Sequence, residues 1–132
     1  MSKREAVLQK ILYVEDEEDI RAVAELALES VGGFTLKSCA SGQQALREGP
    51  DFSPDLILLD VMMPGMDGPS TFEALMSIPA LADTPVIFMT AKVQSDEVAY
   101  YKKLGAVDVI PKPFDPMGLA DQIRGIWANI GD

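Results

Sequence analysis

The chain has 132 residues, of which 48% are hydrophobic and 24% are charged, a composition typical of one globular domain. Its formal net charge of -10 argues against direct contact with nucleic acid, because binding to phosphates requires a basic surface. The chain contains no histidine, which excludes histidine-based metal ligation, acid–base catalysis by histidine and a phosphohistidine relay through this chain.

The N-terminal segment and the cysteine content bear on location. Residues 1–10 are charged and lack the apolar segment of a signal peptide, and we expect residues 1–9 to be a short helical or disordered lead-in. No apolar run approaches the roughly 20 residues needed to span a membrane. The single cysteine, Cys39, cannot form an internal disulfide and is expected to be buried. These features predict a cytoplasmic protein without membrane contact.

Short apolar runs bounded by turn residues predict five strands. The expected ranges are 11–14, 34–40, 55–60, 86–90 and 106–110. The third and fourth runs are almost continuously apolar, which is typical of strands buried on both faces of a parallel sheet.

A predicted helix follows each strand. The first has apolar residues at helical spacing and ends at Gly32-Gly33. Its predicted buried stripe is Ile20, Val23, Ala24, Ala27, Leu28 and Val31. The other helices are expected from Ser41 to Arg47, closed by Gly49-Pro50, over 69–78, from Ser95 to Gly105, and from Asp115 onward. Strict alternation of this kind predicts an α/β fold, a doubly wound five-stranded parallel sheet in one domain.

Polar side chains follow four of the predicted strands at the point where each ends. Glu15 and Asp16 follow the first strand, Asp60 ends the third, Thr90 ends the fourth, and Lys112 lies just beyond the fifth. All strands of a parallel sheet end at one edge, where α/β folds bind ligands. We therefore expect three carboxylates, a hydroxyl and an ammonium to gather there.

The chemistry of this set is specific, although each residue alone also has an ordinary role as a helix-terminal acid, a cap or a solvated lysine. Three carboxylates held close together repel one another, and Mg²⁺, which prefers oxygen ligands, removes that repulsion. A lysine and a threonine hydroxyl can both bind phosphate oxygens. An aspartate in this setting is equipped to form an aspartyl phosphate, so Asp60 is the candidate acceptor.

Four motifs, in this order, resemble the response-regulator receiver domains of two-component signalling. They are Val14–Glu17, Leu59–Gly68, Met89–Ala91 and Pro111–Phe114, and the resemblance covers about residues 9–130. It implies a single receiver domain over 1–132, with the flavodoxin-like strand order 2-1-3-4-5.

The resemblance also implies a mechanism. Asp60 would accept a phosphoryl group from the phosphohistidine of a histidine kinase or a histidine phosphotransfer protein. Asp16, Asp60 and the backbone carbonyl of Met62 would bind Mg²⁺, with Glu15 acting through water. The chain would then change its binding face for a downstream effector, without being a turnover enzyme on external substrates.

Thr90 and Lys112 would contact the phosphoryl group, and the peptide bond between Lys112 and Pro113 would be cis. The family's switch aromatic lies three residues before this lysine, where the present chain has Val109. Two explanations of how the switch works therefore remain open. Either a tyrosine of the fourth helix (Tyr100 or Tyr101) replaces the switch aromatic, or the switch works by shifts of loops and helices alone.

Two alternative functions are weighed against the switch. A Mg²⁺-dependent aspartyl phosphatase also uses an aspartate at a strand end, but such enzymes have a second aspartate two residues later as the general acid. This chain has Met62 at that position, which argues against the phosphatase. A phosphorylation-independent binding module is disfavoured because all five site positions are retained. The bulky Met62 also leads us to hypothesise slow loss of the phosphoryl group. We expect partners on the face that carries Val98–Lys103.

Overall fold

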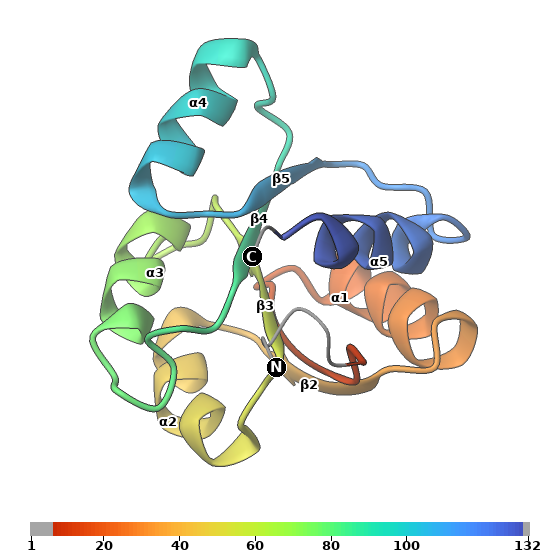
Figure 1. Cartoon of the computed structure of the whole chain (residues 1–132), viewed down its shortest axis with the longest axis horizontal. Helices are drawn as coiled ribbons and strands as arrows, with labels where there is room; N and C mark the ends of the chain where they lie inside the picture. Colours follow the sequence, from red (N-terminus) through yellow and green to blue (C-terminus); the bar gives the residue numbers. More distant parts are fainter. Residues whose placement is uncertain (1–6, 131–132) are drawn as a thin grey trace.

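The computed structural model describes residues 7–130, so most of the predicted lead-in lies outside the described part. Five parallel strands form one sheet in the order β2-β1-β3-β4-β5, as the resemblance implied. Figure 1 shows this sheet between two layers of helices. The strands are β1 (Lys10–Val14), β2 (Thr35–Cys39), β3 (Leu56–Asp60), β4 (Val86–Thr90) and β5 (Asp108–Pro111).

The helices cover both faces of the sheet, with α1 and α5 on one face and α2, α3 and α4 on the other (Figure 1). Their bounds are α1 (Glu18–Glu25), η2 (Leu26–Val31), α2 (Gly42–Phe52), α3 (Gly68–Met76), α4 (Ser95–Leu104) and α5 (Leu119–Asn129). The doubly wound fold predicted from the alternation of strands and helices is therefore confirmed.

The central strands are buried on both faces. Every residue of β3 and β4 is buried, because side chains that alternate along each strand enter two separate apolar clusters, one under each helix layer. Cys39 ends β2 and is fully buried, as predicted, and burial raises the pKa of its thiol to about 11. A thiol with this pKa is inert at neutral pH.

The first helix differs from its prediction. It changes at Leu26 from α-helix to the π-helix η2, in which the Gly32 N–H bonds to the Ala27 carbonyl, five residues back. The wider turn carries Val31 away from the stripe that contains Ala24, and Val31 is 49% exposed. Val23 is also exposed, so the predicted stripe was wrong at both valines.

Two other helix boundaries were predicted wrongly. The helix α2 continues through Pro50 to Phe52, because the partly buried Phe52 packs against the core and holds the last turn in place. The predicted start of α5 at Asp115 is instead a turn, in which the Met117 N–H bonds to the Asp115 carboxylate. The predicted cap at Ser41 is confirmed by its bond from the Gln44 N–H.

Gly68 sits where the chain passes close to the end of β3. A Cβ atom at this position would lie 2.6 Å from the Asp60 carbonyl oxygen and 2.6 Å from Val61 Cα, both backbone atoms. We expect Gly68→Ala to lower the free energy of unfolding by roughly 2 kcal/mol, measured by urea denaturation. Gly125→Ala is the matched control, because a Cβ there meets no atom within 4 Å, and it should stabilise the chain. Equal effects of the two substitutions would contradict the proposed crowding at Gly68.

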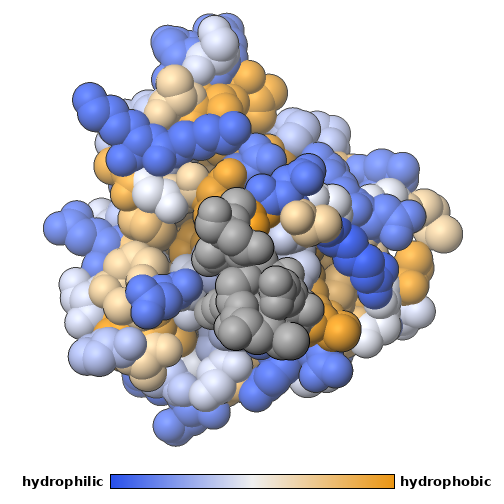
Figure 2. Space-filling view, in the orientation of Figure 1, coloured by the Kyte–Doolittle hydropathy of each residue, from blue (hydrophilic) through white to orange (hydrophobic). Residues whose placement is uncertain are grey.

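Figure 2 shows hydrophilic residues over much of the face in view, with apolar residues in the spaces between them. Across residues 7–130, none of the helices has the length and apolar character required to cross a membrane.

Candidate functional site

The three predicted carboxylates lie together at the carboxyl edge of the sheet. Glu15 and Asp16 follow β1, and Asp60 ends the adjacent strand β3, whose Leu59 is in register with Val14. One carboxylate oxygen from each acid lies within 4.8 Å of the others. Glu15 and Asp60 are almost fully buried, at 0% and 1% exposure. The expectation that these acids converge is therefore met in the structure.

Lys112 is the cation of this cluster. Its Nζ atom lies 2.9 Å from Asp60 Oδ1 and 3.0 Å from Glu15 Oε1, so one ammonium bridges two buried carboxylates. The backbone N–H of Lys112 bonds to the Thr90 carbonyl, which fixes the residue beside β4. The peptide bond to Pro113 is cis, as expected.

Burial and pairing act in opposite directions on these groups. Burial raises the pKa of the Asp60 carboxyl above its ordinary value, and the hydrogen bond from Lys112 opposes that rise. Burial likewise raises the pKa of Glu15, and the hydrogen bond from Lys112 again opposes that rise. Burial alone would lower the pKa of Lys112, but its bonds to Asp60 and Glu15 outweigh burial and raise it. Lys112 is therefore held in its charged form, whereas its hydrogen bonds do not fully offset the cost of burying the charged carboxylates of Glu15 and Asp60.

The donor set fits a hard divalent cation. Asp16 Oδ1 and Asp60 Oδ2 are buried oxygens without a hydrogen-bond partner in the described structure. Buried polar atoms are rarely left unpaired, so this edge of the sheet has ligand atoms to offer. Three carboxylates against one bridging ammonium also leave an excess of negative charge that Mg²⁺ would offset. The Met62 side chain is 64% exposed and points away from the core.

Thr90 has different partners from those expected for a residue of the carboxylate cluster. Its hydroxyl is buried at the end of β4, where it accepts a bond from the Lys92 N–H at 3.1 Å. Among residues 7–130, the direct contacts therefore join Lys112 to Glu15 and Asp60, whereas the Thr90 hydroxyl bonds to the backbone of the loop that follows β4.

Sequence reasoning missed Arg21. Its guanidinium donates a 2.8 Å hydrogen bond to the Glu15 carbonyl and so fastens α1 to the acidic loop. The spacing of six residues carries no signal for this contact, which depends on how α1 leaves the sheet.

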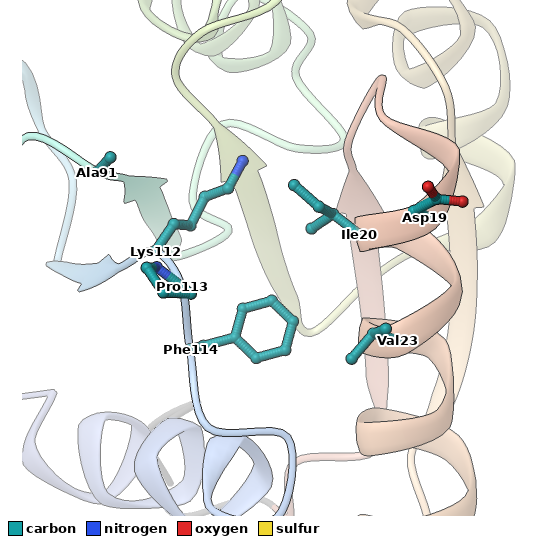
Figure 3. A pocket seen from close by; sticks show the side chains of 7 residues that line it. All are labelled: Asp19, Ile20, Val23, Ala91, Lys112, Pro113 and Phe114. Atoms are coloured by element: carbon teal, nitrogen blue, oxygen red, sulfur yellow. The ribbon is translucent and has the colours of Figure 1, made fainter.

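An apolar pocket of about 450 Å³ opens beside Lys112. Figure 3 shows the Phe114 ring pointing toward Ile20 and Val23 of α1, while the Asp19 carboxylate points away from the pocket. Ala91 and Pro113 complete the lining. Val23 was predicted to be buried with the other apolar residues of its helix, but it is exposed because it lines this pocket.

Comparison with known proteins identifies the family. The family model for the response regulator receiver domain matches residues 11–124. This chain is a response-regulator receiver domain. The receiver domain is 36% identical over 121 residues to the transcriptional regulatory protein CseB of Streptomyces coelicolor, covering 92% of this chain and 50% of that protein. It is also 36% identical to the phosphate regulon regulator PhoB of Pseudomonas aeruginosa, covering 92% of this chain and 52% of that one.

Solved structures agree with this assignment. The chemotaxis protein CheY4 of Vibrio cholerae superposes with a TM-score of 0.83 at 27% identity, covering 91% of this receiver domain and 99% of that chain. The receiver domain of a histidine kinase from Syntrophus aciditrophicus gives 0.77 at 31% identity, with 92% of each chain covered. The present chain spans about half the length of the transcriptional regulators it matches, so their names describe longer proteins.

Proposed function

We propose that this receiver domain is switched by phosphorylation of Asp60, with the phosphoryl group taken from the phosphohistidine of a histidine kinase or a histidine phosphotransfer protein. The observation that carries the proposal is the Lys112 ammonium, which bridges Asp60 and Glu15 within a buried cluster of three carboxylates. A structural ion pair needs no third acid beside it, whereas a phosphoryl-transfer site needs excess acceptor oxygens for a metal.

Glu15, Asp16 and Asp60, with the backbone carbonyl of Met62, would hold Mg²⁺. The metal would neutralise charge on the phosphoryl oxygens during transfer. An oxygen of the Asp60 carboxylate forms the new bond to phosphorus as the bond between phosphorus and the donor imidazole nitrogen breaks, and the electron pair returns to that nitrogen. Lys112 stays protonated and contacts the phosphoryl oxygens, and Thr90 donates one hydrogen bond to them.

The pocket beside Lys112 supports a site for the phosphodonor. A donor histidine must enter along the carboxyl edge of the sheet, and this pocket offers an apolar surface at that edge from Ile20, Val23 and Phe114. Exposed apolar side chains that line a hollow are typical of docking surfaces for an amphipathic helix. We propose that the helix bearing the phosphohistidine packs here.

The proposal includes the remaining expectations from the sequence. It describes one receiver domain over 1–132, acting in the cytoplasm as a switch and not as a turnover enzyme on other phosphoesters. The effector is proposed to bind near α4. The acidic charge that argues against nucleic acid concerns this receiver domain alone, because CseB and PhoB are named as transcriptional regulators, and the matched region is only about half of each.

Incubation with a small phosphodonor such as acetyl phosphate tests the proposal. We expect an acid-stable, hydroxylamine-labile label in the parent with Mg²⁺, and no label without Mg²⁺ or in Asp60→Ala, measured by intact mass. Asp83→Asn is the matched control, because Asp83 is exposed in the loop before β4 and should label normally. An equal label on Asp60→Ala would refute Asp60 as the acceptor, and turnover of a generic phosphoester would favour the phosphatase alternative.

A further inference from the structure

The Arg21 side chain reaches back from α1 to the backbone of the acidic loop that follows β1. Its Nη1 atom donates a 2.8 Å hydrogen bond to the Glu15 carbonyl oxygen, and the same nitrogen lies 3.5 Å from the Asp16 carbonyl oxygen. The backbone of Arg21 is fixed as well, because its N–H bonds to the Glu17 carbonyl at 2.9 Å. One side chain therefore joins the helix to the first two residues of the acidic loop.

Arg21 makes these contacts although several carboxylates lie close to it along the chain. Glu17 and Glu25 are four residues away and Glu18 is three residues away, which are the spacings at which side chains on a helix meet. Among residues 7–130, the Arg21 guanidinium nevertheless forms no ion pair with a carboxylate. The loop backbone is therefore its preferred partner over the acids of its own helix.

Asp16 is the acid of the cluster whose position depends most on its backbone. The Glu15 carboxylate is held directly, because it accepts bonds from Lys112 and from the Glu17 N–H. Asp16 Oδ1, in contrast, is buried without a hydrogen-bond partner in the described structure. Because a peptide unit is planar, a bond to the Glu15 carbonyl fixes the plane that also carries the Asp16 nitrogen. Arg21 thereby limits where the Asp16 carboxylate can point.

We propose that Arg21 is a positioning residue for Mg²⁺, which holds the Glu15–Asp16 peptide so that the Asp16 carboxylate stays beside Asp60. This role rests on the Mg²⁺ site of the proposed function. A guanidinium near the cluster repels a cation, so its removal would by charge alone tighten Mg²⁺ binding. Loss of a positioning group has the opposite effect, because groups that orient metal ligands typically contribute roughly 10–100-fold to metal affinity. The two effects therefore differ in sign.

Isothermal titration calorimetry with Mg²⁺ alone tests this role without any phosphodonor. We expect Arg21→Met, which keeps an apolar stem and removes the hydrogen-bond donors, to bind Mg²⁺ roughly tenfold more weakly than the parent. Arg21→Lys should recover most of the affinity, because its ammonium can still donate to the Glu15 carbonyl. Arg47→Met is the matched control, because Arg47 is exposed on α2, and it should bind Mg²⁺ as the parent does.

Phosphorylation by acetyl phosphate gives a second readout, which a merely structural role would not change. Arg21→Met should need roughly tenfold more Mg²⁺ than the parent for half-maximal labelling, and its labelling rate should approach that of the parent when Mg²⁺ saturates the site. Unchanged or tighter Mg²⁺ binding by Arg21→Met would overturn the role of Arg21 and leave the proposed function intact. Failure of the parent to bind Mg²⁺ would instead refute the proposed metal site and the role of Arg21 with it.

Discussion

Lys112→Met is expected to slow phosphorylation of Asp60 by a small phosphodonor by roughly 10²–10³-fold, the usual cost of removing one positioned donor to a developing charge. Methionine keeps most of the apolar stem and removes the ammonium that lies 2.9 Å from Asp60 Oδ1. In the described structure this ammonium is the cation that pairs with the buried carboxylates, and no other residue is placed to replace it.

The same substitution should also affect stability. Glu15 and Asp60 would lose a shared counterion at almost complete burial, which costs roughly 3 kcal/mol in the free energy of unfolding at neutral pH. Urea unfolding gives this value, and phosphorylation rates must be measured where both proteins are folded. Lys103→Met, at an exposed lysine of α4, is the matched control. A rate for Lys112→Met equal to that of the control would show that Lys112 has no role in transfer.

Mg²⁺ is expected to stabilise the receiver domain at neutral pH and to lose this effect in acid. Burial raises the pKa of Asp60 and of Glu15 above their ordinary values of 3.8 and 4.5. A carboxyl group with a raised pKa favours folding below its unfolded pKa, and this contribution is lost as the pH rises through the folded pKa. Without metal, the contribution of these two acids to stability therefore falls as the pH rises from about 4 toward neutrality.

Saturating Mg²⁺ should reverse that loss, because it binds only the ionised cluster of the folded state. At a free concentration a hundredfold above its dissociation constant, a ligand stabilises by about 2.7 kcal/mol, or roughly 10 °C in Tm for a domain of this size. Thermal unfolding at several pH values, with and without Mg²⁺, measures this. Asp60→Asn should be more stable than the parent without metal, because one of three clustered charges is gone, and should respond weakly to Mg²⁺. A Mg²⁺ effect of equal size at pH 4 and pH 7 would contradict the site.

Much of the fold could be predicted because its signals are local. Continuous apolar runs such as Leu56–Leu59 set the buried strands, and the alternation with helices then allows few arrangements other than a parallel sheet covered on both faces. Errors arose where packing overrides local preference. Proline usually breaks a helix, yet α2 continues through Pro50 because Phe52 gains contacts with the core.

The sequence by itself determined that Glu15, Asp16, Asp60, Thr90 and Lys112 would share one edge, because parallel strands all end on the same side. Only the tertiary structure decided how they pair. Lys112 bridges two acids across the sheet, and the π-helical turn of η2 leaves Val31 exposed. These contacts depend on side-chain reach and on the position of each helix over the sheet. Both are set by packing between residues distant in the chain, which local patterns do not encode.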